Sequence, residues 1–157
     1  MITKSELKKG AWVIIPLENE SGYALGVITH QYKTIRLGYF FNKVYQSSSD
    51  IVITGNAVKN DFALIARFSV NKIENASWQL VKTDMHFIKE NWPIPTFRMQ
   101  EPLTEVYYAV VYDETLINES RYKISKAEAD KLFAYSLYGY VALEKELTRI
   151  FERTVLK

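Results

Sequence analysis

Residues 11–17 read AWVIIPL, residues 23–28 read YALGVI and residues 34–41 read TIRLGYFF. These runs are rich in β-branched and aromatic residues, and polar turns separate them, which is typical of an antiparallel meander. Gly26 and Gly38 lie inside two of the runs, where glycine indicates a bend or a close backbone approach. In the third run one face is apolar at every second position: Ile35, Leu37, Tyr39 and Phe41.

Composition limits the classes of protein. The chain has 157 residues, of which 48% are apolar and 24% charged, as is ordinary for one globular domain. Twenty Lys and Arg residues against 18 Asp and Glu give a net charge of +2, whereas a nucleic-acid-binding protein is expected to carry a clustered basic face. Without cysteine, the chain has no disulfide, thiolate metal site or cysteine nucleophile.

The N-terminal residues are charged where a signal peptide needs an apolar core. No apolar run approaches the roughly 20 residues that cross a bilayer. We therefore expect a cytoplasmic protein that does not contact a membrane.

The periodicity changes along the chain and predicts its organisation. Strands are expected over residues 62–70, 78–82 and 105–112, while residues 46–60 are polar and turn-prone. Ser125 and Glu128 have the spacing of a helix capping box, and apolar residues then recur at helical spacing. Because strands precede helices, the class is α+β. We expect a strongly curved antiparallel sheet or a small SH3-like barrel at the N-terminus, a further hairpin, and C-terminal helices packed on the sheet.

These elements predict a single domain over residues 1–157. Its parts are a β-rich scaffold (about 7–83), a proline-containing crossover (84–104), a hairpin (105–124) and two helical segments (125–155).

No set of residues has the spacing of a catalytic or metal site. His30 and His86 are far apart and neither belongs to a ligand-spaced pair, so no metal and no cofactor is expected. No serine lies in a nucleophile elbow, and no glycine-rich phosphate loop occurs. We therefore predict that the protein is not an enzyme. A pocket that brings His30 or His86 to a carboxylate would reopen that question.

Several short stretches resemble, in order, the bacterial immunity protein 26 family. The opening KKGAWVIIPL (8–17) and YALGVI (23–28) are similar to the family's first two strands. FALIA (62–66) and WQLV (78–81) are similar to its apolar strand and following tryptophan, and WPIPTF (92–97) resembles its Pro-x-Pro-x-Phe element. LYGYVALE (137–144) resembles the start of its terminal helix.

The resemblance implies a function without catalysis. Members of the family neutralise a cognate toxin of a polymorphic toxin system by forming a stoichiometric complex, so the expected partner is a toxin protein. Eleven tyrosines suit a recognition surface, since interface hot spots favour Trp, Tyr and Arg. The candidate partner-binding residues are the exposed members of a set near the proline segment: Trp92, Phe97, Arg98, Tyr107, Tyr108 and Tyr112.

The alternative is a small β-barrel binding module for single-stranded nucleic acid or a small ligand. Arg36 and Arg67 would then lie among the aromatic residues of the strands, where bases could stack. The balanced charge disfavours nucleic acid.

Overall fold

The computed structural model describes residues 1–51, 53 and 61–155; residues 52 and 54–60 of the turn-prone segment lie outside the described residues. Its strands are β1 (Ala11–Pro16), β2 (Tyr23–Tyr32), β3 (Ile35–Phe41), β4 (Phe62–Ser69), β5 (Gln79–Thr83), β6 (Phe97–Gln100), β7 (Tyr107–Tyr112), β8 (Glu119–Ile124), β9 (Phe133–Ala134) and β10 (Leu137–Tyr138). Its helices are α1 (Lys126–Ala129) and α2 (Tyr140–Val155), with 3-10 turns η1 (Glu18–Glu20), η2 (Ser48–Asp50), η3 (Ile73–Asn75) and η4 (Lys89–Asn91).

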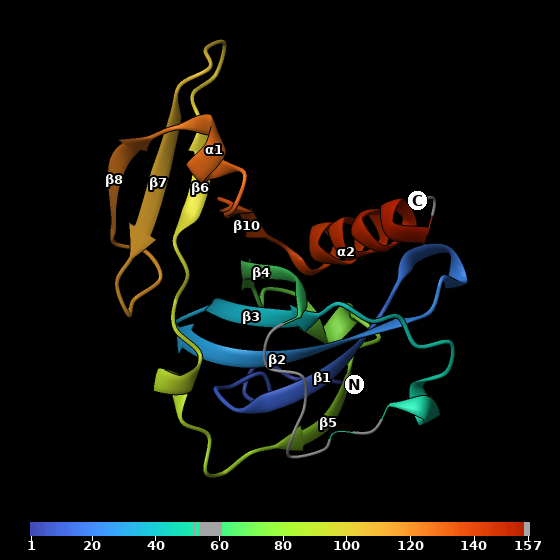
Figure 1. Cartoon of the computed structure of the whole chain (residues 1–157). Coiled ribbons are helices and arrows are strands. Elements are labelled where there is room, and N and C mark those ends of the chain that lie inside the picture. Colours follow the sequence, from blue (N-terminus) through green and yellow to red (C-terminus); the bar gives the residue numbers. More distant parts are fainter. Residues whose placement is uncertain (52, 54–60, 156–157) are drawn as a thin grey trace.

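The predicted meander forms the centre of a six-stranded sheet, in the order β10-β4-β3-β2-β1-β5 (Figure 1). Its neighbours pair antiparallel except β10, which runs parallel to β4. The register shifts once in each of the pairs β1–β5, β2–β3 and β3–β4. Such bulges bend strands and increase their twist, so the sheet curves strongly. The α+β prediction is confirmed. Of the two forms expected for the N-terminal part, the structure has the curved sheet and not the closed barrel, because the sheet stays open with β5 and β10 at its edges.

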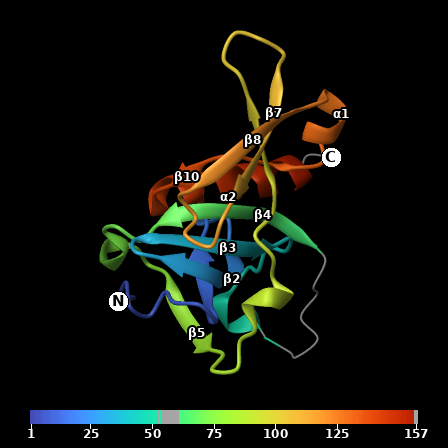
Figure 2. The ribbon, with the colours of Figure 1, turned by 90° about the vertical axis from the view of Figure 1, so that its left-hand side faces the viewer.

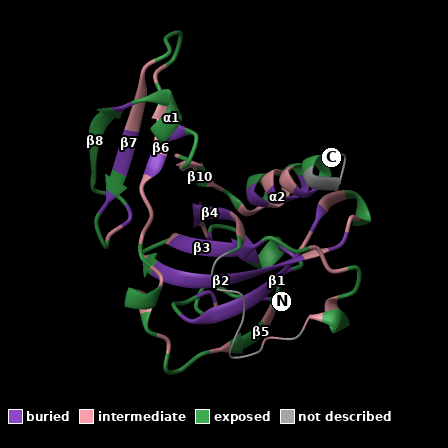
Figure 3. Ribbon diagram, viewed as in Figure 1, coloured by how far each residue is buried: buried purple, intermediate pink, exposed green. Residues whose placement is uncertain are grey.

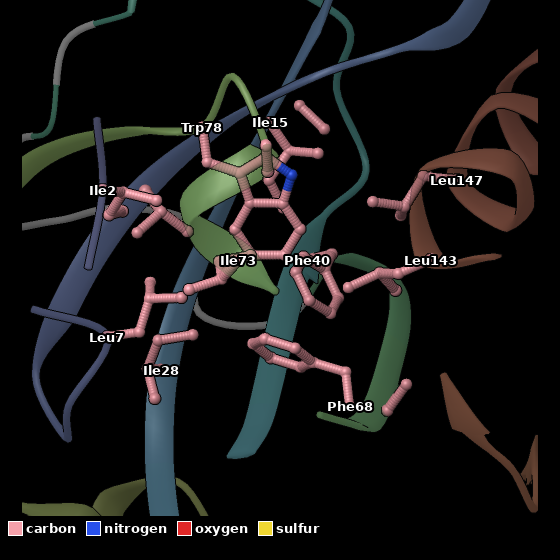
Figure 4. Packing of buried hydrophobic residues seen from close by; sticks show 14 of the residues in the cluster. Ile2, Leu7, Ile15, Ile28, Phe40, Phe68, Ile73, Trp78, Leu143 and Leu147 are labelled. Carbon is pink, nitrogen blue, oxygen red and sulfur yellow. The ribbon is translucent and has the colours of Figure 1, made fainter. Parts of the chain in front are cut away.

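Helix α2 and the N-terminal segment cover one face of this sheet. Leu143, Leu147 and Phe151 recur along one side of α2 and join a buried apolar cluster with Phe40 and Phe68 (Figure 4). The burial of this stripe explains why the amphipathic pattern correctly predicted α2.

Phe40 explains the two strand glycines. A Cβ added at Gly26 would lie 2.7 Å from Cδ1 of Phe40, and one added at Gly38 would lie 2.6 Å from its Cζ. The two glycines thus leave a flat backbone surface on which the ring rests, which confirms the predicted close approach.

The second sheet covers the opposite face. It has the order β8-β7-β6-β9, and the β6–β7 end of this sheet stands above β3 and β2 in Figures 1 and 2. Phe97 and Val110 from this sheet pack with Leu37, Tyr39 and Phe41 of the first sheet. The central strands β1–β4 are therefore buried on both faces, as their purple colour in Figure 3 shows, whereas the edge strands β5 and β10 are more exposed.

Three details differ from the prediction. The helix after the Ser125–Glu128 capping box is only four residues long, because the chain leaves it at Asp130. Residues 133–138, which we call the C-terminal strap, then pair in parallel with β6 and next with β4. Residues 97–100, expected as part of a crossover, form β6. Within β4, Phe62 and Leu64 pack on opposite faces of the sheet, because the bulge at Ala63 turns the ring of Phe62 toward Phe41.

Candidate functional site

The six candidate partner-binding residues do not form one surface. Phe97 and Tyr112 are buried, and their rings meet edge to face with centroids 6.0 Å apart. Both lie between the two sheets, where they hold the second sheet against the first. They can support a contact surface but expose little area of their own.

Trp92 fixes the crossover to the sheet. Its half-buried ring stacks on Phe87 at 5.9 Å and meets Tyr39 edge to face at 5.2 Å and Trp12 at 6.3 Å. The hydroxyl of Tyr39 also donates a hydrogen bond to the carbonyl oxygen of Pro93. Burial raises the pKa of Tyr39 to about 12, so it stays a neutral donor. The aromatic contacts give Trp92 a structural role.

Arg98, Tyr107 and Tyr108 lie on the second sheet and are half-buried. A guanidinium nitrogen of Arg98 donates to the carbonyl oxygen of Leu132, which ties β6 to the residues before the strap. Tyr107 and Tyr108 point to opposite faces of β7, since they are adjacent in a strand. The loop after β6 projects beyond them at the top of Figures 1 and 2, and at its tip the side chain of Leu103 is fully exposed.

An arginine–tyrosine cluster that the sequence did not reveal lies where the two sheets meet. The guanidinium carbon of buried Arg67 is 4.1 Å from the ring centre of Tyr112 and 5.5 Å from that of Tyr135. The two tyrosine rings stack 6.3 Å apart, and Arg121 approaches Tyr135 at 5.5 Å. Burial raises the pKa of Tyr112, while the positive charge of Arg67 opposes the rise. Among the described residues Arg67 forms no ion pair, and its charge is instead stabilised by aromatic faces.

The β7–β8 loop connects this cluster to the first sheet. The side chain of Asp113 accepts hydrogen bonds from the backbone N–H of Thr115 (2.9 Å) and from the side-chain amide of Asn118 (3.2 Å). Asp113 is therefore a hydrogen-bonded turn residue. Leu116 adopts a positive φ of 62° and is fully buried in the core between the sheets, and its carbonyl oxygen accepts from Arg67 at 2.8 Å.

Glu114, in the same loop, reaches a polar pocket of about 250 Å³. Its lining comes from four segments that are distant in sequence: Lys8, Lys9, His30, Gln31, Lys89 and Glu114. Glu114 Oε2 lies 3.0 Å from Lys89 Nζ and 3.9 Å from Nε2 of His30. The second distance is too long for a hydrogen bond.

The β2–β3 bulge places His30 in this pocket. Thr29 is the extra residue, because Ile28 pairs with Gly38 and His30 with Leu37. The hydroxyl of Thr29 donates to the carbonyl oxygen of Leu37 (3.3 Å) and lies 3.0 Å from Nδ1 of His30. We assign the hydroxyl proton of Thr29 to its bond with Leu37, so that Nδ1 of His30 donates to Thr29 and Nε2 of the neutral ring is left as an acceptor.

The surroundings of His30 favour its neutral form. Its side chain is only 4% exposed, and burial lowers its pKa below 6.5. Lys89 and Lys9 also lower the pKa, whereas Glu114 and Glu90 raise it. Nε2 therefore faces the pocket as an unprotonated acceptor at neutral pH.

This pocket meets the condition that would reopen the question of an enzyme, because it brings His30 near a carboxylate. Its lining residues, however, include no serine, threonine or cysteine that the imidazole could activate. Within the described ranges, no group of three or more His, Cys, Asp or Glu is arranged to hold a metal ion. The geometry therefore supports binding better than it supports catalysis.

The two arginines considered for nucleic-acid stacking are both occupied. Arg36 is buried and donates to four backbone carbonyls, those of Leu7, Lys33 (2.6 Å), Ile35 (3.2 Å) and Lys4 (3.3 Å), and its bonds to Leu7 and Lys4 fasten the N-terminal segment to β3. Arg67 is held between the sheets. Neither side chain offers a face to an extended strand of bases, so the structure does not favour the alternative function.

Comparison with known proteins identifies the family. A family model described as immunity protein 26 matches residues 8–108, which is more than half of the chain. The chain belongs to the immunity protein 26 family. The matched region of this immunity protein 26 member begins just before β1 and ends inside β7, so it includes His30, Lys89 and Arg67 but not Glu114.

No curated protein and no solved structure matches the chain. Among the described residues of this immunity protein 26 member, no helix is long and apolar enough to cross a membrane.

Proposed function

We propose that this chain neutralises a cognate bacterial toxin by binding it in a stoichiometric complex, without catalysis. The observation that carries the proposal is the match to the immunity protein 26 family over residues 8–108. The proposal includes a cytoplasmic location and a polymorphic toxin system as the source of the partner. A chain without cysteine is compatible with a reducing compartment.

The projecting part of the second sheet is the contact surface that we favour. It carries the two half-buried tyrosines of the predicted set, Tyr107 and Tyr108, one on each face of β7, and beyond them the fully exposed side chain of Leu103. Tyrosine provides rigid contact area with few rotatable bonds. Phe97 and Tyr112 support this part from the core, Arg98 ties it to Leu132 just before the strap, and Trp92 holds the crossover that leads into it.

The direct test is co-expression with the toxin encoded beside the gene for this chain. We expect the intact chain to restore growth and to co-purify with the toxin in a fixed ratio. A toxin that remains fully lethal during co-expression of the folded chain would contradict the proposal.

Matched substitutions test the contact surface separately. Leu103→Glu adds a charge at the projecting tip, and Val141→Glu adds the same charge at an exposed position of α2. We expect both variants to fold like the parent chain, and only Leu103→Glu to weaken the complex, by about tenfold or more, as is common for a residue that anchors an interface. Equal affinity of the two variants for the toxin would place the contact elsewhere and leave neutralisation itself intact.

A further inference from the structure

The His30 pocket contains more positive charge than its own ion pairs neutralise. Its lining residues are Lys8, Lys9, His30, Gln31, Lys89 and Glu114. Lys89 is paired with Glu114 at 3.0 Å, but Lys8 and Lys9 form no ion pair with any residue in the described part of the chain. Gln31 accepts a hydrogen bond from the backbone N–H of Lys9 through Oε1 (2.8 Å), so its side-chain NH2 group remains a donor. The pocket thus offers ammonium and amide donors, which suit the oxygens of an anion.

The same pocket also contains two facing acceptors. His30 is more than nine-tenths buried, and its Nε2 has no hydrogen-bond partner among the described residues. Across a gap of 3.9 Å lies Oε2 of Glu114. A ligand that brings a proton between these two acceptors can hydrogen-bond to either of them. An ammonium ion would supply protons, but three lysines in the lining repel it.

We propose that this pocket binds a phosphate group that retains one acidic proton, as in hydrogen phosphate or a phosphate monoester. The P–OH group donates toward Nε2 of His30 or toward Glu114. The remaining oxygens accept hydrogen bonds from Lys8, Lys9 and the amide of Gln31. The proposal concerns a different surface from the projecting hairpin and does not depend on toxin neutralisation.

Phosphate and sulfate differ in whether they keep an acidic proton near neutral pH. Inorganic phosphate carries a proton at neutral pH as hydrogen phosphate, and a phosphate monoester, with its second pKa near 6, keeps one in a fraction of its molecules at pH 6.5, whereas sulfate has none. Both ions satisfy the lysines, but only phosphate also satisfies the facing acceptors. Glu114 repels a fully deprotonated anion, while Lys89 and Lys9 attract it, and Glu90 adds a further negative charge to the field at His30.

The test is a proton NMR titration of the full chain that follows the imidazole resonances of its two histidines. Inorganic phosphate, O-phosphoserine, sulfate and acetate are added at constant ionic strength near pH 6.5. We expect phosphate or O-phosphoserine to shift the His30 resonance to saturation and to raise its apparent pKa, and the tighter of the two identifies the source of the group. Exposed His86 should respond to none of the ions and serves as the internal control.

Two variants with the same charge change make the result specific. Lys9→Gln removes a lysine of the pocket, and Lys123→Gln removes an exposed lysine of β8. We expect Lys9→Gln to weaken phosphate binding by about tenfold and Lys123→Gln to leave it unchanged. Equal binding of sulfate and phosphate, equal loss in both variants, or no saturable shift of His30 with either phosphate compound would each overturn the proposal.

Discussion

The contact between Phe40 and the two strand glycines allows a quantitative test of the core. In Gly38→Ala the new Cβ would lie 2.6 Å from Cζ and 2.9 Å from Cε2 of Phe40, whereas ordinary van der Waals contacts are 3.4–4 Å. The Phe40 ring cannot move sideways along the sheet to avoid the new methyl group, because its other edge already rests on Gly26. Phe68, with its ring centroid 6.2 Å away, closes the space above it.

Two effects of opposite sign determine the outcome. Overpacking a filled core typically costs about 1–3 kcal/mol. Replacing glycine by alanine also restricts the unfolded chain, which stabilises the fold by about 0.4–1 kcal/mol. Because the methyl group meets a rigid buried ring, we expect overpacking to win by about 1–2 kcal/mol. For a chain of this length that corresponds to a decrease in Tm of about 2–8 °C.

Urea unfolding followed by tryptophan fluorescence measures the change. Gly139→Ser is the matched control, because a Cβ at Gly139 meets nothing within 4 Å and the Gly139 carbonyl accepts from the N–H of Leu143 at the start of α2. Serine at this N-cap position should stabilise by a few tenths of a kcal/mol. In a Phe40→Leu background, Gly38→Ala should become nearly neutral. A Gly38→Ala protein as stable as the parent would refute the reasoning.

Three further predictions concern the contacts around the core. Burial raises the pKa of Glu144, so the folded chain retains a proton that the unfolded chain releases near 4.5, and stability falls as pH rises through the folded pKa. Glu144→Gln keeps an acceptor for Nε1 of Trp78, which lies 2.7 Å from the Glu144 carboxylate. The substitution should raise the free energy of unfolding at pH 7 and flatten its pH dependence. Urea titrations at several pH values that show no gain in stability would contradict this. Trp92→Ala should destabilise by about 3 kcal/mol in the same assay, and a change below 1 kcal/mol would argue against its structural role. Arg36→Lys should lower the free energy of unfolding by about 2 kcal/mol, since one ammonium group cannot replace the several hydrogen bonds of the guanidinium group. Amide hydrogen exchange should accelerate first in residues 2–8. An equal acceleration along the whole chain would show that Arg36 does not anchor the N-terminal segment.

Local periodicity was sufficient for the parts of the fold that repeat a pattern. The alternation in β3 correctly placed Leu37, Tyr39 and Phe41 on one face, and the apolar stripe of α2 predicted its packing side. Elements of two to four residues are too short to show an apolar repeat in the sequence. Strands β9 and β10 exist because they pair with the distant segments β6 and β4, so the apolar spacing around Phe133 was wrongly attributed to a helix.

The candidate sites depend even more on the tertiary fold. The bulge at Thr29 has no sequence signal, yet it directs His30 into the pocket. Lys89 and Glu114 come from a crossover and a loop whose positions follow from the packing of Trp92 and Leu116. Arg67 meets Tyr135 only because the strap runs past β4. The types of residue could be anticipated from the sequence, but their convergence could not.

The C-terminal strap also has a consequence for biosynthesis. Its two short strands complete the edge of β6 and the edge of β4, both of which are synthesised long before it. Chains emerge from the ribosome N-terminus first, so both sheets can form while these two edges are still unpaired. An unpaired edge is a template for pairing with another chain. A chain that lacks the strap therefore presents two such edges together, and pairing of the strap with both of them removes the two templates at once.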